Sequence, residues 1–90
     1  MCYRYVISGR VQGVFFRAST QQLAEQHGVS GWVKNLPDGR VETFACGPSE
    51  SVQQFEQWLH HGPRLADVRE VVKTPAECHA AGSFEIHRGN

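Results

Sequence analysis

The sequence lacks the features that mark several large classes of protein. Its nine Lys and Arg residues equal its nine Asp and Glu residues, so the formal net charge is zero, and no basic cluster is present to bind nucleic acid. No apolar run approaches the roughly 20 residues that span a bilayer, and the first residues show no apolar segment of a secretory signal. We therefore expect a cytoplasmic protein that binds neither nucleic acid nor a membrane.

Metal and nucleophile motifs are also missing. The three cysteines form no C-x-x-C pair, and the spacing of the five histidines does not match a zinc site. His60 and His61 are adjacent, but neighbouring residues on a helix point about 100° apart and cannot easily share an ion. No pair of carboxylates and no Ser-His or Cys-His arrangement stands out. The sequence predicts no metal and no cofactor.

What is present is an ordinary globular composition. Hydrophobic residues make up 40% of the chain and charged residues 20%. Ninety residues are enough for one modest core and too few for two. We expect a single domain over residues 1–90 and, because no exposed apolar stripe is evident, a monomer.

Residues 7–17 (ISGRVQGVFFR) are the most informative stretch. They predict a strand that enters a glycine-containing loop, which leads into the first turn of a helix and ends on Arg17. Free backbone amides in a curled loop and at a helix N-terminus attract anions, and a guanidinium beside them suits phosphate. A glycine loop between a strand and a helix is more often only a connection, so this stretch alone does not decide the matter.

A second stretch, residues 31–42 (GWVKNLPDGRVE), favours a phosphate site over a plain connection. The two segments together resemble the two signature motifs of acylphosphatases, and the resemblance covers the full length of both. The size of the chain and the order of its predicted elements also resemble that family, so the likeness spans nearly all 90 residues. It implies hydrolysis of small acyl phosphates without a metal or cofactor, with inorganic phosphate as product and inhibitor.

The resemblance also implies roles for individual residues. Arg17 matches the arginine that binds the transferred phosphoryl group, and Asn35 matches the asparagine that orients the attacking water. Taken alone, Arg17 would be an ordinary surface arginine and Asn35 an ordinary residue at a strand end. The expected phosphate-binding loop comprises Val11, Gln12, Gly13, Val14, Phe15, Phe16 and Arg17.

The remaining pattern predicts the fold. Alternating strands are expected over residues 3–8, 31–36 and 40–46, with the turn Pro37-Asp38-Gly39 between the last two. Helices are expected from Arg17 to His27, ended by Gly28, and after Ser49 as N-cap. Strands over residues 65–73 and 83–88 complete a βαββαβ order with a short last strand. This is a ferredoxin-like α+β sandwich, with two helices on one face of an antiparallel or mixed sheet.

Three other functions fit the same fold. A non-catalytic module could bind phosphate or a partner, but the intact Arg17 and Asn35 oppose that. The fold also serves RNA binding, but residues 40–46 lack the required aromatic pattern. The acylphosphatase-like domain of larger carbamoyl-transfer maturation proteins is a third possibility, opposed by the short chain and the absence of a following zinc-finger segment.

Strand parity makes one further prediction. Cys2 and Cys46 should lie on the sheet face that is turned away from the helices, on strands that are antiparallel neighbours. Directly facing residues bring their Cα atoms within disulfide range. We therefore expect a Cys2–Cys46 bridge that forms on oxidation and leaves Cys78 free, whereas reduced thiols are the usual state in a cytoplasm.

Overall fold

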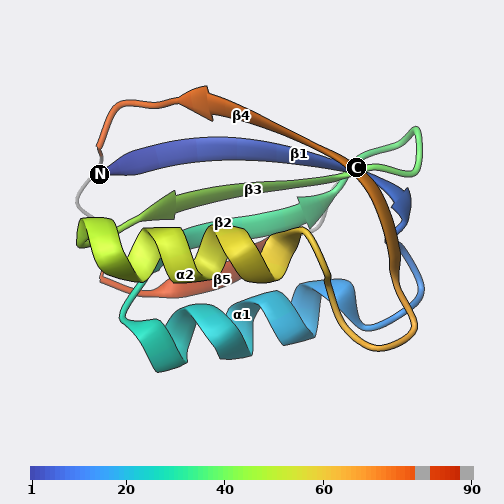
Figure 1. Ribbon diagram of the computed structural model, residues 1–90, viewed down its shortest axis with the longest axis horizontal. Coiled ribbons are helices and arrows are strands. Elements are labelled where there is room, and N and C mark those ends of the chain that lie inside the picture. The colour runs from blue at the N-terminus through green and yellow to red at the C-terminus, as the bar shows by residue number, and fades with distance from the viewer. Residues whose placement is uncertain (79–81, 88–90) are drawn as a thin grey trace.

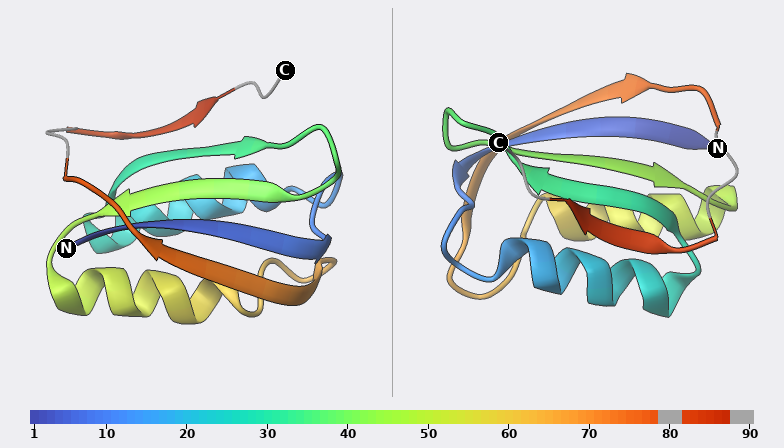
Figure 2. Two further views of the ribbon diagram at one scale, coloured as in Figure 1. Left: turned by 90° about the horizontal axis from the view of Figure 1, so that it is seen from above. Right: turned by 180° about the vertical axis from the view of Figure 1, so that it is seen from behind.

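A computed structural model describes residues 1–78 and 82–87 and has two layers, a five-stranded sheet and two helices (Figure 1). The elements follow the expected order: β1 (Cys2–Arg10), α1 (Phe16–His27), β2 (Ser30–Asn35), β3 (Val41–Cys46), α2 (Ser49–Leu59), β4 (Asp67–Pro75) and β5 (Phe84–His87). Both helices cover the same face of the sheet (Figures 1 and 2). This confirms the predicted ferredoxin-like α+β fold.

The strand order in the sheet is β4-β1-β3-β2-β5. β1 pairs antiparallel with β3 in the centre, as predicted, and β2 pairs antiparallel with β3 through the turn that follows Asn35. β5 is parallel to β2 at one edge. The loop that follows β1 and the hairpin that follows β2 therefore lie at the same end of the sheet (Figure 1).

The main core fills the space between the sheet and the helices because each element buries one face. On the strands the buried side chains alternate, as Tyr5, Ile7 and Val41 do. On α2 the predicted stripe of Val52, Phe55 and Leu59 is buried. Helix α1 ends at Gly28, as predicted. Gly28 has a left-handed backbone conformation, and the amide of Val29 donates to the carbonyl of Ala24.

A polar contact joins α2 to the sheet. The Tyr5 hydroxyl donates to Oε1 of Glu56 (3.0 Å), which also accepts from Lys73 Nζ of β4 (2.8 Å). Burial raises the pKa of Tyr5 above its ordinary value, so its hydroxyl stays protonated and can donate. Burial alone would raise the pKa of Glu56, but the hydrogen bonds from Lys73 and Tyr5 outweigh it and lower that pKa. Glu56 is therefore a carboxylate that connects three elements.

Two local predictions were wrong. Strand β4 covers Asp67–Pro75 rather than residues 65–73, because its register is set by pairing with β1, from Arg10 opposite Asp67 to Tyr3 opposite Pro75. Pro75 is tolerated there because it ends an edge strand. At α2 the N-cap position is held by Pro48, whose carbonyl accepts from the amide of Val52, and no side chain caps the helix. Arg88, which the predicted last strand included, lies outside the described residues.

Candidate active site

The loop between β1 and α1 has its backbone folded around two left-handed residues. Gly13 has φ 74° and Phe15 has φ 61°. Val11 and Val14 point into the core and are almost fully buried, so the loop is fixed on its inner side. A bulky residue such as Phe15 in this region is strained by roughly 1–3 kcal/mol, a cost that occurs mainly at functional sites. Phe15 is nevertheless 77% exposed, so packing of its ring does not explain the strain.

The backbone amides of this loop are available to an anion. The first hydrogen bond of α1 runs from the amide of Ser19 to the carbonyl of Phe15 (3.0 Å). Within the described residues, no acceptor receives a hydrogen bond from the amides of residues 13–18. The first turn of α1 also contains no acidic side chain. The positive end of the helix dipole is therefore left for an external negative charge.

Arg17 follows directly in the first turn of α1. Its side chain is half-buried and forms no ion pair with any described residue. Buried Phe16 beside it packs on Trp58 of α2, with ring centroids 5.6 Å apart, and fixes the start of the helix. Arg17 thus presents a permanent positive charge with five donors, without an internal acid to neutralise it.

Asn35 is the last residue of β2, paired with Val41 of β3. Its Oδ1 atom is buried, and none of the described residues donates a hydrogen bond to it. A buried carbonyl without a donor costs free energy, so such an atom is unusual unless a ligand or water uses it. Asn35 and Arg17 line the same pocket, which has a volume of about 320 Å³.

Gln12 connects the β1–α1 loop to the hairpin between β2 and β3. Its Nε2 donates to the carbonyl of Leu36 (2.8 Å) and to that of Arg40 (2.9 Å), the two residues that flank the hairpin turn. The loop and the end of β2 are therefore fixed relative to each other. The sequence placed Gln12 in the loop, but nothing in its pattern indicated these partners.

The pocket also has an apolar rim. Phe15 forms one part of it, and Ile86 of β5 forms another and is 39% exposed. No sequence motif links Ile86 to the site, because β5 reaches it only through the parallel pairing with β2. The pocket thus places an apolar surface beside a cationic and donor-rich one.

A larger hollow, of about 590 Å³, lies at the other end of the sheet and includes Cys2, Cys46 and Cys78 in its lining. The smaller pocket is the candidate active site, because Arg17, the free amides and Asn35 meet there. Cys46 of the larger hollow pairs with Ser30 at the start of β2, and Asn35 lies five residues further along that strand, so about 17 Å of strand separates the two.

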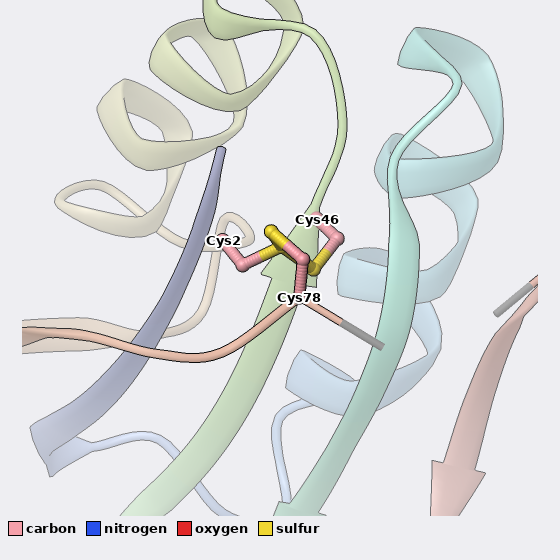
Figure 3. A group of neighbouring side chains, drawn as sticks. All are labelled: Cys2, Cys46 and Cys78. Carbon is pink, nitrogen blue, oxygen red and sulfur yellow. A yellow bond between two sulfur atoms is a disulfide. The ribbon is translucent and has the colours of Figure 1, made fainter. Parts of the chain in front are cut away.

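The cysteines lie as strand pairing requires, with one addition. Cys2 is directly opposite Cys46, as predicted, with a Cα–Cα distance of 4.2 Å. Cys78, which the prediction left apart, approaches the same place (Figure 3), and its Cα lies 5.3 Å from that of Cys2. The sulfurs of Cys46 and Cys78 are each within bonding distance of the Cys2 sulfur. Because one sulfur forms one disulfide, these are two mutually exclusive pairings.

Across the described residues, none of the helices is long and apolar enough to cross a membrane.

The fold and the pocket define a class: a small α+β sandwich whose loop amides and arginine suit a phosphoryl group. The sequence model of the acylphosphatase family matches residues 3–86. The acylphosphatase of Halorhodospira halophila is 53% identical over 83 residues, which are 92% of this chain and 90% of that protein.

Solved structures agree with the sequence comparison. Acylphosphatase from Bacillus subtilis superposes with a TM-score of 0.92 at 37% identity, covering 96% of this chain and 97% of that one. An acylphosphatase from Coxiella burnetii gives the same TM-score at 40% identity, covering 96% and 90%. The chain belongs to the acylphosphatase family, which confirms the resemblance seen in its two motifs.

Proposed function

We propose that this protein hydrolyses the carboxyl–phosphate bond of small acyl phosphates to a carboxylate and inorganic phosphate. Family membership supports the reaction. The single observation that carries the mechanism is Asn35 Oδ1, a buried acceptor without a donor among the described residues, in the same pocket as Arg17.

In this proposal the β1–α1 loop binds the phosphoryl group. The unpaired amides between Gly13 and Ala18 donate to its oxygens, and Arg17 adds a bidentate, charged contact. Each charge-assisted hydrogen bond of this kind contributes roughly 1.5–3 kcal/mol. Phosphoryl transfer develops charge on the equatorial oxygens, so these donors stabilise the transition state as well as the bound substrate.

Asn35 positions the nucleophile. An amide does not titrate, so Asn35 cannot act as a base, but Oδ1 can accept a hydrogen bond from water and direct a lone pair toward phosphorus. Because Gln12 fixes the hairpin to the loop, the distance and orientation of the water relative to the phosphoryl group are held constant.

The pocket needs no general acid or base. The leaving group is a carboxylate, which is a stable anion at neutral pH. Arg17 is the only ionisable side chain among the described residues that line the pocket, and its guanidinium has no acceptor atom to take a proton from water. We therefore assign the proton of the attacking water to an oxygen of the phosphoryl group itself.

The test is phosphate release from benzoyl phosphate by the purified chain, with and without EDTA. We expect turnover far above the spontaneous rate, and the same rate with the chelator. A protein that binds phosphate but releases none above background would be a binding module, which would overturn the proposal. Loss of turnover in EDTA would contradict the metal-free mechanism.

The same proposal includes a single domain that works as a monomer in the cytoplasm. Balanced charge and the lack of an apolar stripe in the sequence support it. Size-exclusion chromatography with light scattering tests the monomer, which should have a mass near 10.1 kDa.

We also propose that oxidation joins Cys2 to Cys46. Both side chains are 7% exposed and are held opposite each other by strand pairing, whereas Cys78 is exposed and lies beyond the end of β4. The bridge spans 44 residues and should stabilise the fold by about 4 kcal/mol at most, with little effect on turnover. Peptide mapping and thermal melts of oxidised and reduced protein test this. A bridge to Cys78, or three free thiols after oxidation, would contradict it.

A further inference from the structure

Three cysteines from three separate segments meet on the face of the sheet that carries no helix (Figure 3). Cys2 begins β1, Cys46 ends β3, and Cys78 follows β4 by three residues. Their sulfurs all lie within 4.8 Å of one another. Cys46 and Cys78 are 44 and 76 residues from Cys2 in the chain, so no spacing motif indicates the three as a group.

A disulfide engages only two of these three sulfurs. A sulfur forms only one disulfide, so any pairing leaves one of the three thiols beside the bond. The sulfurs of Cys46 and Cys78 both contact the Cys2 sulfur, so reduction would leave three neighbouring thiols, for which no side-chain hydrogen bond to a described partner is present. A metal ion is the ligand that engages three sulfurs at once.

The dimensions and surroundings suit a soft cation. With Zn–S bonds of about 2.3 Å, two thiolates on one tetrahedral zinc ion lie about 3.8 Å apart. The sulfurs of Cys46 and Cys78 lie within 4.8 Å of each other, and the Cys2 sulfur, which is within bonding distance of both, has to move away from them for the ion to enter. The side chains packed around the cysteines are apolar: Phe44, Trp32 and Ala76. Thiolates in such surroundings need a positive charge, and a divalent ion supplies it.

Access to the cluster is open on one side. The hollow of about 590 Å³ beside it is lined by all three cysteines and by small residues such as Gly28 and Gly47. Cys78 is exposed, whereas Cys2 and Cys46 are nearly buried. An ion can therefore enter from the hollow, and water or another small ligand can occupy its fourth position.

We propose that the reduced protein binds one thiophilic divalent ion, zinc in the first place, through the thiolates of Cys2, Cys46 and Cys78. Binding fixes the segment after β4 to the ends of β1 and β3. Because each thiol must lose its proton, affinity falls as the pH is lowered. The cysteines are about 17 Å, or five residues of β2, from Asn35, so the ion takes no part in hydrolysis.

Cobalt and zinc test this site in the full chain. Reduced wild-type protein, titrated anaerobically with Co²⁺, should show thiolate-to-cobalt charge-transfer absorption that saturates at one equivalent and is abolished by one equivalent of Zn²⁺. Cys46→Ser and Cys78→Ser should each weaken zinc binding at least about tenfold in competition with a chromophoric chelator. Disulfide formation in the wild type should prevent binding.

Glu25→Ala is the matched control. Glu25 lines the same hollow and carries a negative charge, but it is not one of the three ligands, so this variant should bind zinc like the wild type. Circular dichroism checks that every variant is folded, and Cys78→Ser is the safest because Cys78 is exposed. Absence of the charge-transfer absorption in the reduced wild type, or unchanged zinc affinity in folded Cys78→Ser, would overturn the proposal.

Discussion

Asn35→Ala should lower kcat by roughly 10²–10³-fold, the scale of losing one group that acts in the transition state, while KM changes little. The substitution removes the buried carbonyl that we assign to the attacking water. It leaves the loop amides and Arg17 in place, so the phosphoryl group still binds. Steady-state kinetics with benzoyl phosphate measures both constants.

Arg17→Ala should fail differently. Arg17 contacts the phosphoryl group in the ground state and in the transition state, so KM should rise as kcat falls. Arg17→Lys should recover only part of the activity, because an ammonium cannot reproduce the bidentate contact of a guanidinium. The Asn35 and Arg17 variants are thus distinguished by whether KM changes together with kcat.

Binding of inorganic phosphate separates the two variants independently of turnover. Phosphate should raise the Tm of wild-type protein and of Asn35→Ala by mass action, but not that of Arg17→Ala. Arg4→Ala serves as the charge control, since Arg4 pairs with Glu42 (3.4 Å) on the face of the sheet away from the helices. Wild-type kcat in Asn35→Ala would contradict the water-positioning role, and an undiminished phosphate shift in Arg17→Ala would place the anion elsewhere.

The sequence predicted the parts of the site that lie within one continuous motif. Residues 7–17 contain the strand end, the glycine and the arginine that a phosphate loop needs, but the phosphate role was favoured only once this stretch and residues 31–42 were seen to resemble the two acylphosphatase motifs. The position of Asn35 followed from the turn chemistry of residues 37–39, which requires a hairpin directly after it. The element order then brought both segments to one end of the sheet.

Contacts between distant segments could not be predicted in this way. Gln12 reaches two backbone carbonyls across the hairpin, and a backbone carbonyl has no signature in a sequence. Ile86 reaches the pocket only through the parallel pairing of β5 with β2. Cys78 follows the edge strand β4, which was expected to end two residues earlier. Its approach to Cys2 depends on the pairing of β4 with β1, which local pattern does not encode.

Gly31→Ala should destabilise the protein by roughly 3–5 kcal/mol, the range of the most damaging single substitutions. Gly31 lies in β2 with φ 142°, a conformation that residues with a Cβ rarely adopt. A methyl group there would also overlap the backbone carbonyl of Phe44 in β3, and backbone cannot move aside as a side chain can. At about 4–8 °C per kcal/mol, Tm should fall by more than about 12 °C.

Gly28→Ala isolates the cause of that loss. Gly28 also has a positive φ, 69°, but a methyl group added there meets nothing within 4 Å. Its replacement should therefore cost only the left-handed strain, about 1–2 kcal/mol. Thermal melts of the two variants compare conformational strain alone with strain plus steric overlap. Equal losses would show that β2 and β3 can separate to admit the methyl group, and the close approach of the two strands at Gly31 would then not be what requires glycine.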